Sequence, residues 1–173
     1  DAQPKETPAL SNRADSIAYQ VYESLGGPEA WNSLKYLRFT FAVESSGSRQ
    51  PVAHHMWNRH TGDYRVEWSS EGGDTTFVVL FNVNTQKGSA YANGQELSSE
   101  RSGEMVDQAY RRYINDTYWM LAPVKLLDEG ANRTYLPDSS SAETAVLHVN
   151  FGDVGLTPGD EYWHYVDRQS HRL

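Results

Sequence analysis

The fold is decided by residues 115–130, which read NDTYWMLAPVKLLDEG. Apolar side chains leading into and along this stretch recur three or four residues apart, a spacing that predicts one face of a helix. They are Tyr110, Tyr113, Ile114, Tyr118 and Leu121. Pro123 cannot continue a helix and disfavours helical geometry at Ala122. We therefore predict a helix over 104–121, a short strand over 124–127, and an aromatic helix face that acts as a lid over an apolar cavity.

Outside this stretch, apolar and polar residues alternate along most of the chain with a period of two. In 36–44, Leu37, Phe39 and Phe41 alternate with polar residues, which is typical of a half-buried strand. The same reasoning predicts strands at 52–60, 64–69, 75–83, 88–92, 132–136, 144–151 and 161–166. A first helix is predicted over 13–25, with Ser11 or Asn12 as its cap. Asn93-Gly94 predicts a tight hairpin.

Consecutive strands joined by short turns predict an α+β fold built on a single antiparallel sheet. We expect at least seven strands in one strongly curved sheet. The helices at 13–25 and 104–121 are too few to alternate with the strands, so they should cover the concave face. The predicted organisation is a flexible leader at 1–12 followed by one domain at 13–173. Because no partner strand follows 161–166, we expect that C-terminal strands are lacking.

Composition narrows the classes of function. The chain has 173 residues with 15 Lys and Arg against 23 Asp and Glu, a net charge of −8. Such a surface repels nucleic acid and anionic membranes. Cysteine is absent, which rules out thiol catalysis and cysteine-bound metals. No apolar run approaches the length of a membrane span. The polar segment DAQPKETPALSN at 1–12 fits either a flexible leader that joins a removed export signal or an anchor to the domain, or an arbitrary end of the sequence.

The polar residues do not assemble a recognisable reactive site. His54 and His60 lie roughly 20 Å apart on a regular strand, too far to share a metal. His148 and His164 are predicted to point away from the core on neighbouring strands, and we expect no metal site and no cofactor. The serines lie in turns without a GxSxG motif, so no catalytic residue is assigned and the protein is expected not to be an enzyme.

Three stretches carry a family resemblance. They are ADSIAYQVYESLGGPEAWNSLKYLRF at 14–39, INDTYWMLAPVKLLDEG at 114–130, and LHVNFGDVGLTPGDEYWHYVDRQSHRL at 147–173. Their most specific marks are Gly26-Gly27 with Trp31, Tyr118-Trp119 with Pro123 and Lys125, and Pro158-Gly159-Asp160 before Tyr162 and Asp167. In these respects the chain resembles the LolA-like family of periplasmic lipoprotein carriers and outer-membrane lipoprotein-sorting proteins, most closely a bacterial branch of it.

The resemblance implies a half-barrel whose mouth is covered by helices and whose cavity holds an acyl chain. It also implies export to the periplasm, either free or anchored to the outer membrane on its periplasmic side. No stretch matches the interaction residues of the known carriers, so no functional residue is transferred from them. We expect a monomer whose partners are a lipid or acyl chain and, in addition, envelope proteins.

The expected function is a non-enzymatic carrier that binds a lipid or lipoprotein acyl chain. The cavity-lining residues are predicted to be the large apolar ones of the concave face and the lid. They are Phe39, Phe41, Val66, Trp68, Phe77, Val79, Phe81, Tyr113, Tyr118 and Leu121. On the lid helix, Arg111, Arg112 and Asp116 are expected to stay exposed. Two alternatives remain open: an envelope interaction module with a filled core, and an unrecognised hydrolase.

Overall fold

The computed structural model describes residues 10–152 and 159–173, which form two compact units. The first unit is Leu34–Asp116, and the second combines Thr117–Leu173 with the N-terminal segment that ends at Ser33. Each unit has its own apolar core. The sequence had indicated one domain. Most of the predicted leader, residues 1–9, lies outside the described residues.

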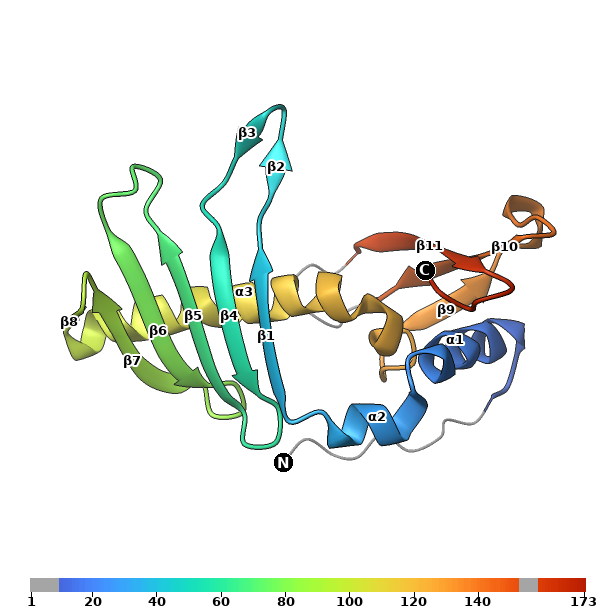
Figure 1. Cartoon of the computed structure of the whole chain (residues 1–173), viewed down its shortest axis with the longest axis horizontal. Helices are drawn as coiled ribbons and strands as arrows, with labels where there is room; N and C mark the ends of the chain where they lie inside the picture. Colours follow the sequence, from blue (N-terminus) through green and yellow to red (C-terminus); the bar gives the residue numbers. More distant parts are fainter. Residues whose placement is uncertain (1–9, 153–158) are drawn as a thin grey trace. The chain divides into compact units, whose positions relative to one another are not determined.

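The first unit is built on a six-stranded antiparallel sheet (Figure 1). Its strands follow the order β1 (Tyr36–Phe41), β4 (Ala53–Asn58), β5 (Asp63–Ser69), β6 (Thr76–Asn82), β7 (Lys87–Ala92) and β8 (Gln95–Glu96). A small hairpin of β2 (Glu44–Ser45) and β3 (Ser48–Arg49) connects the first two. The order is open at β1 and β8, so the sheet is not a closed barrel.

Strand pairing sorts the side chains into two faces. One row across the sheet is Phe39, His55, Val66, Val79 and Ala90, and the neighbouring rows on the same face carry Trp57, Tyr64 and Phe81 or Ala53, Trp68 and Phe77. The Asn93-Gly94 hairpin is confirmed. Both residues have positive φ, 49° and 81°, which a two-residue hairpin turn with matching twist requires.

Helix α3 (Ser99–Lys125) begins in the first unit and covers the apolar face of its sheet. Figure 1 shows the helix running behind β4 to β7. Met105, Val106 and Ala109 project from it and are 0–5% exposed. Because Ala109 follows Met105 by four positions and Val106 by three, these residues form one stripe of the helix that packs on this side of the sheet.

The second unit packs α1 (Arg13–Ser24) against a three-stranded antiparallel sheet. The sheet order is β11 (Glu161–Asp167), β10 (Thr144–Asn150) and β9 (Asn132–Tyr135). The short helices α2 (Gly27–Ser33) and η1 (Pro137–Ser139) complete the unit. Asn12 caps α1 as predicted, because its side-chain oxygen accepts a hydrogen bond from the Asp15 amide at 2.9 Å.

The prediction of one continuous sheet is wrong. In the described residues β1 pairs only with β4, and β9 pairs only with β10, so the strands form separate sheets of six and three plus a hairpin. Alternation within a strand establishes that the strand exists and which residues share a face. It carries no information about which distant strand lies beside it.

The predicted strand at 124–127 is also wrong, because α3 continues through Pro123 to Lys125. Proline removes one helical hydrogen bond, a local cost of about 3 kcal/mol. The next turn still closes, with the Leu126 amide donating to the Ala122 carbonyl at 3.1 Å. Val124 and Leu126 are 8% and 1% exposed, so burial of this turn offsets the proline.

A partly buried ion pair links α1 to β9 and to the turn after α3 in the second unit. The Arg133 side chain lies 3.0 Å from the Asp15 carboxylate and also donates to the carbonyls of Leu126 and Ala131, each at 2.7 Å. Burial raises the pKa of Asp15, but hydrogen bonds from Ser11 and Arg133 together outweigh it and lower the pKa below its usual value. Asp15 therefore stabilises the fold in its ionised form.

We predict that Asp15→Asn destabilises the protein by about 1.5–3 kcal/mol at neutral pH, because a charged hydrogen-bond acceptor is lost. The lowered pKa of Asp15 means that its contribution is complete above the unfolded value of about 4 and fades as the pH falls through the folded value. Urea unfolding at pH 7 and pH 3 measures this difference. An equal penalty at both pH values would contradict the assignment.

Candidate functional site

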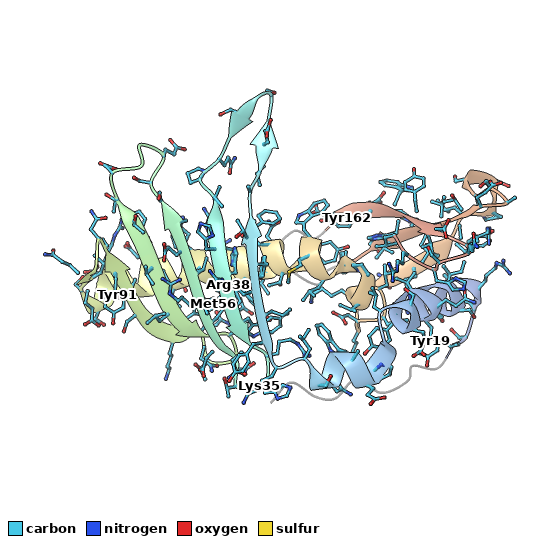
Figure 2. All side chains as sticks on the ribbon, viewed as in Figure 1. Tyr19, Lys35, Arg38, Met56, Tyr91 and Tyr162 are labelled. Carbon is cyan, nitrogen blue, oxygen red and sulfur yellow. The ribbon has the colours of Figure 1, made fainter. Side chains whose placement is uncertain are left out.

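The face of the six-stranded sheet that α3 does not cover holds the candidate site. One row across this face is Arg38, Met56, Arg65, Leu80 and Ser89, paired strand to strand from β1 to β7. Figure 2 shows Arg38 and Met56 close together on this side, and Tyr91 further along the sheet. We call this surface the open face.

A groove with a volume of about 640 Å³ lies on the open face. Its walls come from β1, β4, β5, β6 and the start of β7. The residues that line it are Tyr36, Leu37, Arg38, Met56, Trp57, Asn58, Asp63, Tyr64, Arg65, Leu80, Phe81, Asn82 and Lys87. Small-molecule sites in proteins have volumes of about 300–1,000 Å³, so the groove is large enough for a ligand.

The groove exposes large apolar side chains to solvent. Tyr36 is 64% exposed, Met56 46% and Leu80 42%. Single exposed apolar residues are ordinary on protein surfaces, but a group of them in one hollow marks a binding surface.

Charged groups surround this apolar surface. Arg38, Arg65 and Lys87 line the groove, and Asp63 is the lining carboxylate. Hydrogen bonds from Thr61 and Asn82 lower the pKa of Asp63, so it is ionised and its oxygens are already engaged. Arg65 forms an ion pair with Glu67 on its own strand. The groove therefore joins an apolar floor to a rim with a surplus of positive charge.

The predicted cavity residues lie mostly elsewhere. Seven of them share the sheet face under α3: Phe39, Phe41, Val66, Trp68, Phe77, Val79 and Phe81. Val66 and Val79 are fully buried there, and Tyr113 of α3 packs against Trp57 and Tyr64 with ring centroids 5.2 and 5.0 Å apart. Among the ten, Phe81 also contributes to the groove.

Phe41, one of these seven, also borders a smaller hollow of about 320 Å³ beside Arg111 and Arg112. Tyr118 and Leu121 belong to the second unit, where Tyr118 packs against Phe151 and Tyr162 with ring centroids 5.1 and 5.0 Å apart. Binding of a lipid or acyl chain between α3 and the sheet stays a prediction.

A polar cluster missed by the sequence lies inside the α3 face. His55 is fully buried, with its Nε2 3.1 Å from Oδ2 of Asp116 and its Nδ1 2.8 Å from the hydroxyl of Tyr64. The Phe39 ring stacks on the imidazole at 4.4 Å. Asp116 is 3% exposed, so the expectation that it faces solvent is wrong. It lies three residues after Tyr113, on the same helical face.

The cluster is arranged to hold α3 on the sheet. Burial, and then the nearby negative charge of Asp116, raise the pKa of Tyr64, so its hydroxyl keeps its proton and can donate to Nδ1. Nε2 then carries the other proton and faces Asp116. Nδ1 is thus hydrogen-bonded to Tyr64, while Nε2 lies at ion-pair distance from the Asp116 carboxylate. We therefore interpret the cluster as a structural link.

The second unit corrects the histidine assignment. His164 pairs across the strands with Leu147 and is 9% exposed, so it lies on the core side rather than the outer side. Burial lowers its pKa below the usual value. His148 lies on the other side beside Trp163. Among the described residues no cluster of three His, Asp or Glu side chains is close enough to hold a metal ion.

The comparisons with known proteins return no relative. No protein-family model, no curated protein and no solved structure matches the chain. In the part of the chain that the structure describes, no helix combines the length and apolar character needed to cross a bilayer.

We predict that Asp116→Ala destabilises the first unit by about 3–5 kcal/mol, because it leaves the polar His55 ring buried without its charged partner. The double variant His55→Phe/Asp116→Leu removes both polar groups and should recover most of that loss. Chemical unfolding followed by tryptophan fluorescence measures the free energies. If the double variant loses as much as the sum of its single variants, the two residues are not coupled.

Proposed function

We propose that this protein binds an amphiphilic lipid or a lipoprotein acyl chain without transforming it, as a carrier of the cell envelope. The observation that carries the proposal is the groove on the open face. It joins exposed Tyr36, Met56 and Leu80 to a polar rim, which is the arrangement that an acyl chain with a headgroup requires.

The energetics favour such a guest. Each methylene group removed from water contributes about 0.8 kcal/mol, so a chain laid along the groove gains several kcal/mol. Part of this gain offsets the ordering of the chain and of the side chains that meet it. Tyr36, Met56 and Leu80 already face solvent, so binding on the open face does not require α3 to leave the sheet.

The proposal includes the finer features implied by the LolA-like resemblance. They are a half-barrel architecture, export to the periplasm, and an α3 that opens as a lid over a second apolar surface. The six-stranded antiparallel sheet with a helix on one face is compatible with part of such a half-barrel. Release of α3 would expose the face that carries Phe39, Val66 and Val79.

A fluorescent fatty-acid probe tests the proposal. We expect saturable binding that unlabelled lipid displaces. Met56→Glu and Leu80→Glu should each weaken probe binding at least tenfold, because a carboxylate in the floor opposes burial of an alkyl chain. Both residues are exposed in the free protein, so the fold should survive, and circular dichroism checks this.

Tyr91→Glu serves as the matched control. Tyr91 lies on the open face, in a row that does not line the groove, and the same charge is introduced there. It should leave probe affinity unchanged. Absence of saturable binding to the wild-type protein would overturn the carrier hypothesis and favour an interaction module with a filled core. Equal losses in Tyr91→Glu and Met56→Glu would show that the groove is not the site.

A further inference from the structure

We propose that the ligand of the groove is an anionic single-chain amphiphile whose oxyanion headgroup, a carboxylate or a phosphate, is bound between Arg38 and Arg65. This inference rests on the proposed function, because it assumes that the groove takes an amphiphile, and it adds the charge and the position of the headgroup. The chain as a whole has a net charge of −8, so the surplus of positive charge around this groove is opposite in sign to the net charge of the protein.

Arg38 is the key cation. It is exposed on the edge strand β1, and within residues 10–152 and 159–173 no ion pair or hydrogen bond engages its side chain. Arg65 is half-buried, and its guanidinium group forms an ion pair with the Glu67 carboxylate. Lys87 lies on β7, three strands beyond Met56 in the sheet order, where it faces the opposite end of the groove.

The register places the two arginines on either side of Met56. Arg38 and Arg65 are both direct cross-strand partners of Met56, on β1 and β5. Strands lie about 4.8 Å apart, so the two Cα atoms are separated by about 10 Å. A guanidinium group ends several bonds from its Cα, so one oxyanion above Met56 is within reach of both side chains.

The same arrangement provides for the alkyl chain. The apolar stems of the two arginines flank the Met56 side chain while their guanidinium groups stay at the rim. Leu80 continues the row beyond Arg65, and Tyr36 lies two residues before Arg38 on the same strand. The headgroup is thereby bound at the rim, and the chain contacts Met56, Leu80 or Tyr36 below it.

The positive charge of the two arginines also disfavours amphiphiles with cationic or neutral headgroups. Guanidinium groups form charge-assisted, often bidentate hydrogen bonds with carboxylates and phosphates. A cationic headgroup would meet two like charges, and a neutral one would gain only ordinary hydrogen bonds. Asp63 keeps its negative charge, but it lies in the neighbouring row of the sheet with Asn82 and Lys87 rather than in the row of Arg38, Met56 and Arg65.

Isothermal titration calorimetry on the intact chain tests the inference. The ligands carry twelve-carbon chains and are used below their critical micelle concentrations. The ligands are laurate, dodecyl phosphate, dodecanol and dodecyltrimethylammonium, with inorganic phosphate as the headgroup alone. We expect laurate and dodecyl phosphate to bind at least tenfold more tightly than the other two alkyl ligands. Their affinity should fall with added salt, because the exposed rim is screened. Inorganic phosphate should bind far more weakly than dodecyl phosphate.

Three variants locate the headgroup. Arg38→Gln should lower laurate affinity about tenfold, the loss expected for one charged hydrogen-bonding partner, while dodecanol affinity stays unchanged. Arg38→Lys should recover part of the loss. Arg111→Gln is the matched control, because it removes the same charge from an exposed arginine that lines the smaller hollow instead of the groove.

The outcomes separate this inference from the proposed function. If all four alkyl ligands bind with similar affinity, or if Arg38→Gln and Arg111→Gln weaken laurate equally, the anionic headgroup site is overturned while lipid binding stands. If inorganic phosphate binds as tightly as dodecyl phosphate, the site is an ion site and the alkyl chain plays no part. If no amphiphile binds, the proposed function itself fails.

Discussion

One helix can cover only one face of a sheet, and the organisation of the first unit follows from this constraint. Helix α3 buries its stripe of Met105, Val106 and Ala109 against the more apolar face, where Val66 and Val79 are completely buried. Among the described residues of the first unit no second helix covers the other face, and Met56 and Leu80 are exposed there. The groove is thus a direct consequence of how few helices the chain provides.

The position of α3 is specified by polarity as well as by packing. Apolar contacts are non-directional, and a smooth stripe allows a helix to slide or rotate. The His55 link to Asp116 and Tyr64 is directional and is surrounded by apolar groups, so a displaced helix would leave charged and polar atoms buried without partners. In the second unit Arg133 has a similar role, since it ties Asp15 to the carbonyls of Leu126 and Ala131.

The two faces of the sheet therefore differ in kind. The α3 face is covered by the helix, and its buried His55 hydrogen-bonds to Tyr64 and lies beside Asp116. On the open face apolar side chains meet solvent, and so does the guanidinium group of Arg38, which has no ion pair within residues 10–152 and 159–173. Both the apolar surface and the charge are therefore available to a ligand. An amphiphile uses both at once, because burial of its chain and neutralisation of its headgroup occur at neighbouring points of the same hollow.

The sequence alone determined the local pattern of this protein. Period-two alternation located most strands and grouped Phe39, Val66 and Val79 on one face, and Asn93-Gly94 set a hairpin, because these signals depend on neighbouring residues. The tertiary structure decided the separation into two sheets, the burial of Asp116, and the continuation of α3 through Pro123. Each depends on a partner distant in sequence, such as His55 for Asp116. The groove follows the same rule, because only strand register brings Arg38, Met56 and Arg65 into one row.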